Sequence, residues 1–276
     1  MASFSPAPSA PPAVSAENSL FLFELIVCDL HWSAIQTGAL GMMASAAVAA
    51  TNSQGFKLSR HLAYDDFSVT RLALRFAVGI DLSNEQRNLL DRTYADLQQT
   101  VAHLKPFMTQ DTLTPVQREL MRRLLPGLRR VALAAAETIE RIEPLYRMRL
   151  DPGFAFDAAV IRKFLARAAR GERDEFGVDG VLRLPQLRQR RKSPRLPIER
   201  PCRLALPVGE VAAVLLDVSR EGVGLRSQSA VSLGQRVAVV IGARRLEANV
   251  ARVEGDLVGL HLARPLQLSD PLFKAG

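Results

Sequence analysis

Two short polar segments carry residues whose types and spacing could bind a ligand. The first, RRKSPR at 190–195, places four cationic side chains in six residues, just ahead of a segment, IERPCRLAL, that is typical of a β-strand. The second, DVSREG at 217–222, lies between two further strand-like segments. Cationic side chains at the entrance to a sheet fit a solvated linker, an arm that grips nucleic acid, or a site for a small phosphorylated ligand.

The distribution of charge helps to separate these alternatives. The chain has 36 Lys and Arg residues against 28 Asp and Glu residues, a formal net charge of +8. Eight of the basic residues lie between Arg183 and Arg203, where Glu199 is the one acidic residue. A protein that grips duplex nucleic acid usually spreads its positive charge over a long face, and single-strand binders interleave aromatic residues. The sequence therefore disfavours a nucleic-acid partner and predicts one that is small or contacts only this segment.

The DVSREG segment on its own is typical of a tight turn. Asp and Ser side chains hydrogen-bond the backbone of turns, and Gly permits a positive φ. Its position after a strand, with RRKSPR some 22 residues upstream, favours a second role in ligand binding.

The elements that must position these segments fall into two kinds, and residues from about 18 to 175 have a helical period. Ser83–Gln86 has the form of a capping box and precedes an apolar stripe that includes Leu90, Tyr94 and Leu97. Thr114–Gln117 repeats the capping signal with Pro at the first helical position. The apolar stripe predicts the core of a helical bundle, with a seam between two copies of the chain as the alternative.

Prolines and glycines predict where these helices end. We expect the helix after Thr114 to stop or kink near Pro126–Gly127, and a further helix over 131–142 to be disturbed at Pro144. A last helix is expected over 157–170, with Gly171 as its C-terminal stop.

The pattern changes after Gly180 to short segments rich in Val and Leu that are separated by turn residues. The strand-like segments are 211–217, 236–241, 245–253 and 257–262. Short strands at this spacing predict a small antiparallel β-barrel or sandwich. The predicted class is therefore α+β and multidomain, and its parts are a disordered Pro/Ala/Ser-rich tail at 1–17, an α-helical domain at 18–175, a linker at 176–190, a β-barrel at 187–270 and a tail at 271–276.

Other features limit the compartment and the chemistry. The segment 32–50 approaches the length of a membrane span but is rich in Ala, Gly and Ser, so a buried helix is expected there and membrane association is not. Cys28 and Cys202 lie far apart and the four histidines are scattered, which predicts reduced thiols, a cytoplasmic location and no metal site.

The combination of the two polar segments resembles the PilZ domain. The RxxxR motif of that family matches Arg191 and Arg195, and its [D/N]xSxxG motif matches Asp217, Ser219 and Gly222. The likeness covers about 187–270 and extends to the rhythm of the strands, including the Leu-Gly pair at 233–234 and GLHL at 259–262. PilZ domains bind cyclic di-GMP, so the resemblance implies this bacterial second messenger as the ligand.

The chemistry of the matched residues agrees with that ligand. Guanidinium groups can fork onto phosphate oxygens or onto guanine O6 and N7, and can stack on a purine. The carboxylate of Asp217 could accept from guanine N1–H and N2–H₂, an arrangement that adenine cannot match, and Ser219 could add a short polar contact. In the family the RxxxR arm wraps the ligand against the barrel, and an Arg before it, as at Arg190, is compatible with an intercalated ligand pair.

We therefore predict a non-enzymatic receptor for cyclic di-GMP that relays binding to its helical domain or to a protein partner. The alternative is a PilZ-like interaction or scaffold protein that binds no nucleotide. We find no paired acid and base, nucleophile elbow or phosphate loop, so no catalytic residue and no cofactor other than the ligand is expected.

Overall fold

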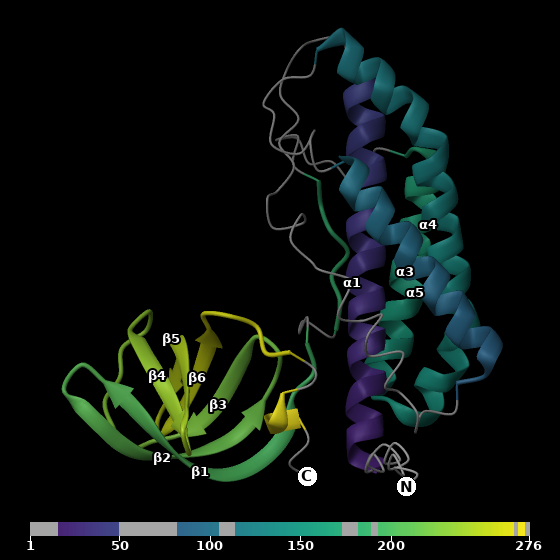
Figure 1. Cartoon of the computed structure of the whole chain (residues 1–276). Coiled ribbons are helices and arrows are strands. Elements are labelled where there is room, and N and C mark those ends of the chain that lie inside the picture. The colour runs from purple at the N-terminus through teal and green to yellow at the C-terminus, as the bar shows by residue number, and fades with distance from the viewer. Residues whose placement is uncertain are drawn as a thin grey trace, which may run out of the picture.

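The computed structural model describes residues 16–49, 82–104, 114–172, 182–188, 193–267 and 270–273. These residues form a group of long helices and a β-barrel that lie side by side (Figure 1). The predicted fold class, a helical region followed by a small antiparallel β-barrel, is thus confirmed. Most of the predicted disordered tail, and the basic residues Arg190, Arg191 and Lys192, lie outside the described residues.

Helix α1 lies against the other three described helices (Figure 1). The four helices are α1 (Ala16–Ala49), α3 (Asn84–Leu104), α4 (Pro115–Arg149) and α5 (Pro152–Arg170). The stripe residues Leu90, Tyr94 and Leu97 are all buried in a core shared by these helices. The Tyr94 hydroxyl donates to the carbonyl oxygen of Ile26 at 2.7 Å, which joins α3 to α1. The bundle core predicted by the apolar stripe is therefore present.

Both predicted capping boxes are present at the helix N-termini. The backbone N–H of Gln86 donates to Ser83 Oγ at 3.2 Å, and Ser83 N–H donates to Gln86 Oε1 at 2.9 Å. Thr114 and Gln117 make the same reciprocal pair at the start of α4. These bonds satisfy backbone N–H groups that have no partner within the helix.

A stop near Pro126–Gly127, one of the two outcomes expected there, is wrong, because α4 continues from Pro115 to Arg149 and also contains Pro144. Both prolines lie on the exposed face of the helix, so the carbonyl groups that lose their helical partner face solvent. The buried face of α4 repeats every three or four residues on both sides of Pro126, from Met121 to Tyr146. Packing along that continuous stripe holds the helix together where local propensity would end it.

Helix α5 ends at Arg170, as expected, and Gly171 follows it with a φ of +72°. Its start lies earlier than expected, because Asp151 caps the helix by accepting from Gly153 N–H at 2.7 Å.

Helix α1 is long and apolar enough over Leu20–Ala49 to cross a membrane, judged by length and composition alone. Within the described residues 72% of the relevant window is buried inside the protein, and a buried helix of a helical bundle passes the same test. His31 of this helix is buried beside the rings of Tyr146 and Phe154, and burial lowers its pKa to about 3.

The second architecture is a closed six-stranded antiparallel barrel in the order β1-β2-β3-β6-β5-β4. Its strands are β1 (Leu196–Leu206), β2 (Gly209–Val218), β3 (Gly222–Arg226), β4 (Arg236–Ile241), β5 (Arg244–Glu254) and β6 (Leu257–Leu262). Closure comes from the pairing of β4 with β1, which leaves no free edge. The barrel core contains inward residues of every strand, among them Leu204, Leu215 and Val239.

The first three residues of the expected C-terminal tail instead pack against the barrel. Pro271–Phe273 forms the 3-10 helix η3, whose Leu272 and Phe273 are buried in the barrel core. The ring of Phe273 stacks on that of Phe21 of α1, with centroids 5.4 Å apart. In Figure 1 the short yellow helix η3 lies beside the lower end of α1. The helical and barrel parts are thus in direct contact.

Part of the expected linker is also packed against the helical domain. Leu182 and Leu187 contact the helical core. The backbone N–H of Arg188 donates to the buried carboxylate of Asp157 at 2.8 Å, and its guanidinium lies 4.0 Å above the ring of Phe156. The chain is therefore held on α5 immediately before the basic segment at 190–195, which we call the basic arm.

Candidate functional site

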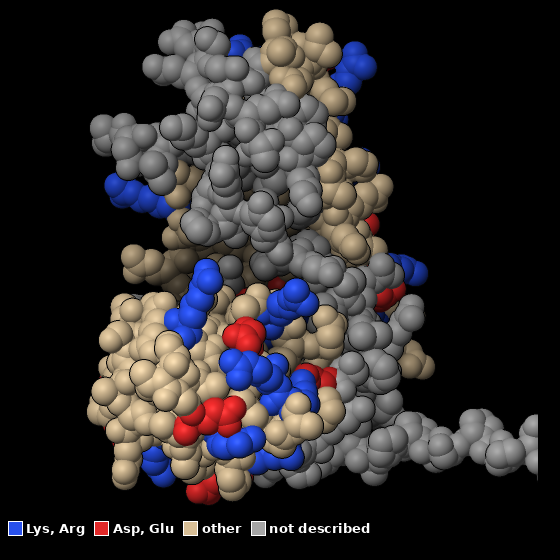
Figure 2. Space-filling model, turned by 60° about the vertical axis from the view of Figure 1, so that its left-hand side comes forward, with Lys and Arg blue, Asp and Glu red and all other residues tan. Residues whose placement is uncertain are grey.

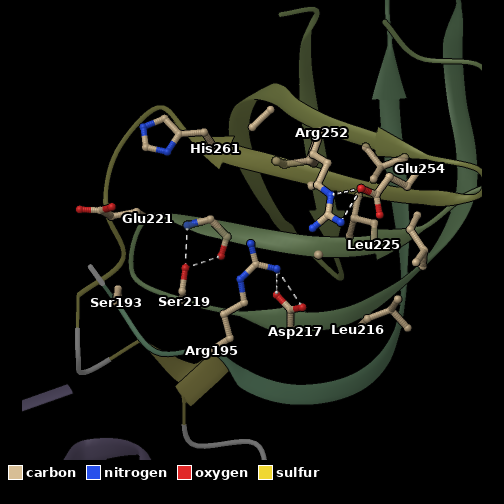
Figure 3. A pocket seen from close by; sticks show the side chains of 17 residues that line it. Ser193, Arg195, Leu216, Asp217, Ser219, Glu221, Leu225, Arg252, Glu254 and His261 are labelled. Atoms are coloured by element: carbon tan, nitrogen blue, oxygen red, sulfur yellow. Dashed lines mark hydrogen bonds and ion pairs between the residues drawn. The ribbon is translucent and has the colours of Figure 1, made fainter. Parts of the chain in front are cut away.

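A cavity of about 450 Å³ lies at the side of the barrel (Figure 3). It is lined by β2, β3, β5 and β6 and by the segment that enters β1. Arg195, Asp217, Ser219 and Gly222 all line it, so the structure brings together every predicted site residue that it describes. Arg190 and Arg191 lie outside the described residues.

Arg195 and Asp217 both line the cavity and contact each other there (Figure 3). Arg195 Nη1 donates to Asp217 Oδ1 at 3.0 Å and to Oδ2 at 3.1 Å. The side chains are 38% and 27% exposed, so solvent and a ligand can reach both. The last residue of the basic arm and the first residue of the DVSREG turn therefore form one polar cluster.

An irregularity in β2 and a glycine in β3 place the Asp217 carboxylate. The pairing of β2 with β3 shifts register between Leu215 and Asp217, and such bulges re-aim side chains. Asp217 then lies over Gly224, where an added Cβ would be 2.6 Å from Asp217 Oδ2. Sequence reasoning missed Gly224, although the Gly-x-Gly at 222–224 was a usable signal for a close approach.

Ser219 holds the DVSREG turn together. Its Oγ accepts from Gly222 N–H at 3.0 Å and donates to the Gly222 carbonyl oxygen at 3.1 Å, and its own N–H donates to that oxygen at 2.8 Å. Ser219 is buried, and these bonds use its polar groups within the turn. The structural role expected of the serine in a tight turn is thus present.

A glycine is needed at position 222 because a side chain would not fit there. The positive φ that the sequence suggested for this residue is absent. Among the described residues, glycines with positive φ occur elsewhere and Gly222 is not one of them. An added Cβ at Gly222 would lie 2.6 Å from the backbone oxygen of Leu260 in β6. The residue lets the end of the turn approach the neighbouring strand and so fixes the wall of the cavity.

The cavity contains further residues that the motifs do not include. Arg252 and Glu254 come from β5, and Gly259 and His261 come from β6. The sequence offered no signal for Arg252, because its place in the cavity depends on how β5 pairs with β6.

Charges on the barrel are mixed rather than uniformly basic. On the face shown in Figure 2, Lys and Arg side chains are interspersed with Asp and Glu side chains. Within the described part of the chain, no group of three or more His, Cys, Asp and Glu residues could hold a metal ion. Cys28 and Cys202 are both buried and unpaired with each other, and burial raises the pKa of each thiol.

The closed barrel thus has a side cavity at which Arg195 meets the DVSREG turn. Residues 189–271 match the PilZ domain, and this part of the chain belongs to that family. PilZ domains are binding domains of a cyclic di-GMP receptor family. The helical region has no family match.

Among solved structures, the chain is similar to the PilZ domain of CeSA from a cellulose-synthesizing bacterium. The two share 21% sequence identity over 27% of this chain and 84% of that chain, with a TM-score of 0.24. No curated protein matches the chain.

Proposed function

We propose that this protein is a bacterial cytoplasmic receptor for cyclic di-GMP, with no catalytic role. In this proposal the ligand is held between the Arg190–Arg195 arm and the DVSREG turn, and binding is relayed to the helical domain. The observation that carries it is the meeting of Arg195 and Asp217, 22 residues apart in sequence, in one cavity of about 450 Å³.

The site has complementary groups for a guanine nucleotide. The Asp217 carboxylate can accept from guanine N1–H and N2–H₂, while Arg191 and Arg195 can fork onto phosphate oxygens or stack on a base. The ligand must displace the ion pair between Arg195 and Asp217. Because both side chains are partly exposed, this pair contributes about 0–1 kcal/mol and its loss is a small barrier to binding.

The DVSREG turn is also joined to the helical domain, which supports a relay. Arg220 lies within the turn, and its Nη1 is 3.9 Å from Asp29 Oδ2 of α1. The Arg220 carbonyl oxygen accepts from Leu266 N–H at 2.7 Å, which links the turn to the segment that leads into η3. Since η3 stacks on α1 through Phe273 and Phe21, two contacts connect the turn to the same helix.

The basic arm offers a second connection. It is bounded by Arg188, which is bonded to Asp157 of α5, and by Leu196, the first residue of β1. A ligand that draws Arg191 toward the cavity, where Arg195 already lies, pulls on a segment anchored to the helical domain. Ligand binding and the position of α5 are therefore expected to be coupled.

The runner-up function is a protein-interaction or scaffold role without nucleotide. Arg195 and Asp217 satisfy each other's charge without a ligand, as they would in a barrel that has lost binding. Val116 and Leu120 on α4 are exposed apolar residues through which a protein partner or a second copy of the chain could be bound.

Thermal unfolding of the full chain with and without cyclic di-GMP distinguishes the receptor function from the scaffold function. A ligand that binds the native state raises the midpoint progressively with its concentration. The receptor proposal predicts such a rise with cyclic di-GMP and none with GMP at equal concentration. An unchanged midpoint at saturating cyclic di-GMP would favour the scaffold role.

A further inference from the structure

Three glycines on two neighbouring strands line the cavity, and we refer to Gly222, Gly224 and Gly259 as the glycine floor. Gly224 of β3 pairs directly with Gly259 of β6, and Gly222 lies two residues earlier on β3. An added Cβ at Gly222 or Gly224 would clash with its surroundings, so both positions accept no side chain without a shift. Because these positions have no side chain of their own, a planar base can approach the backbone of β3 and β6 beside the Asp217 carboxylate.

Figure 3 shows two guanidinium–carboxylate pairs at the cavity, one of which lies against Gly224 and the other against Gly259. One is Arg195 with Asp217, which comes from the β1–β2 side. The other is Arg252 with Glu254, both on β5, with Arg252 Nε donating to Glu254 Oε1 at 2.7 Å. Among the described residues that line the cavity, Arg252 is thus a second arginine beside Arg195, and it belongs to neither motif.

A bulge in β5 places Arg252 at the cavity. The pairing of β5 with β6 shifts register between Val250 and Arg252. The alternation of buried and exposed residues breaks there, because Ala251 and Arg252 are both exposed in succession. Arg252 pairs with Gly259, where an added Cβ would lie 3.3 Å from Arg252 Cβ. A bulge and Gly259 therefore place Arg252 against the glycine floor, as a bulge and Gly224 place Asp217 against it from β2.

The partner of Arg252 does not hold it firmly. The Arg252 and Glu254 side chains are 67% and 55% exposed, and exposed ion pairs contribute little to stability. By contrast, Arg244 pairs with Asp270, whose side chain is only 9% exposed, in a contact that fixes η3. The Arg252 guanidinium can therefore leave Glu254 for a ligand.

We propose that Arg252 is a specificity-determining residue that binds the O6 and N7 atoms of a guanine lying on the glycine floor. This inference rests on the proposed function, because it assumes a guanine nucleotide in the cavity. A guanidinium beside a base makes its commonest specific contact with these two guanine acceptors. Adenine offers an amino donor in place of O6, so Arg252 adds discrimination between the two purines to that expected from Asp217.

The chain provides a matched control on the same strand. Arg245 donates from Nε to Glu247 Oε1 at 2.8 Å with the same spacing as Arg252 and Glu254, and neither residue lines the cavity. Arg252→Ala and Arg245→Ala thus remove the same charge and the same kind of exposed pair, and differ only in the cavity.

The test is a calorimetric titration of the full chain and both variants with cyclic di-GMP and with its 7-deaza analogue, which lacks the N7 acceptor. We expect Arg252→Ala to weaken cyclic di-GMP binding about tenfold or more, and Arg245→Ala to leave it unchanged. The wild type should bind the analogue more weakly than cyclic di-GMP, and Arg252→Ala should reduce that difference. Circular dichroism and unfolding temperatures should match in all three proteins.

The outcomes separate this inference from the proposed function. If the wild type binds cyclic di-GMP but the two variants bind alike, Arg252 is a surface residue and only this inference is wrong. The assignment is also overturned if Arg252→Ala binds cyclic di-GMP more weakly than the wild type does but favours it over the 7-deaza analogue by the same factor. Absence of binding by the wild type would overturn the proposed function and this inference together.

Discussion

Arg195 donates from one nitrogen, Nη1, to both carboxylate oxygens of Asp217, at 3.0 and 3.1 Å. These residues end the basic arm and begin the acidic turn, so the contact joins the two segments at the cavity. In the proposed function, a ligand exchanges this contact for its own. Stability and ligand affinity should consequently respond differently to the same substitutions.

Asp217→Ala tests the acidic turn. We expect it to weaken cyclic di-GMP binding by about 1–3 kcal/mol, because a base edge loses its acceptor. Folding stability should change by less than about 1 kcal/mol, since the ion pair with Arg195 is partly exposed. Calorimetry and urea unfolding measure the two quantities, and unchanged affinity in a folded variant would reduce DVSREG to a turn.

Arg191→Ala and Arg195→Ala test the clamp against simple attraction. Each should reduce affinity by about 1.5–3 kcal/mol, and Arg191→Lys should not restore it, because ammonium lacks the planar fork. Arg188→Ala is the control: its guanidinium lies over Phe156 of α5, so its loss should leave affinity nearly unchanged. Equal small losses in all three alanine variants, with full rescue by Lys, would return the arm to a charged linker.

Gly222→Ala tests the close approach of β3 to β6. The added Cβ would lie 2.6 Å from the Leu260 backbone oxygen, which cannot rotate away. We expect a loss of about 1–3 kcal/mol in the free energy of unfolding and weaker ligand binding. Gly127→Ala on α4 meets no atom within 4 Å and should be neutral or stabilising. A Gly222→Ala protein as stable as the wild type would contradict the account of this position.

Phe21→Ala tests the contact between α1 and the barrel. Removing the ring that stacks on Phe273 should lower stability and disconnect η3 from α1. In the wild type, cyclic di-GMP should slow hydrogen exchange near the start of α1, and in the variant this effect should shrink while binding persists. Leu20→Ala is the neighbouring control, because that side chain is 45% exposed. An undiminished effect in Phe21→Ala would exclude this route.

The Arg244–Asp270 pair predicts a pH dependence. Partial burial opposes ionisation of Asp270, but hydrogen bonds from Arg244 and from Leu272 N–H outweigh it and lower the pKa of the carboxyl. A lowered folded-state pKa contributes stability above the ordinary value for Asp, and this is lost as pH falls through the lowered pKa. Asp270→Asn should therefore be less stable than the wild type at pH about 7, and the difference should shrink in urea unfolding at pH about 2. A constant difference at both values would contradict this.

Local signals in the sequence predicted much of the fold. The β4 and β6 segments match the observed strands residue for residue, because turn residues bound both. Both capping boxes and the Gly171 stop were also readable, since each depends on neighbours within a few residues. Helix α4 was mispredicted where a long-range stripe of contacts outweighs Pro126.

The cavity was predictable only in part. Arg195, Asp217, Ser219 and Gly222 belong to motifs of fixed spacing, and the structure places them together. Arg252 depends on a bulge in β5, and the contact between Arg220 and Asp29 depends on how the two domains pack. η3 was missed because the burial of Phe273 requires Phe21, more than 250 residues away along the chain.

The most direct test of the central claim is a calorimetric titration of the full chain with cyclic di-GMP, cyclic di-AMP and GTP. A site built from Asp217 and forked arginines should bind cyclic di-GMP saturably and tightly. Cyclic di-AMP should bind far more weakly because adenine offers Asp217 no matching donors, and GTP because it has one base rather than two. Equal binding of all three nucleotides, or no binding of cyclic di-GMP by the folded protein, would contradict the account.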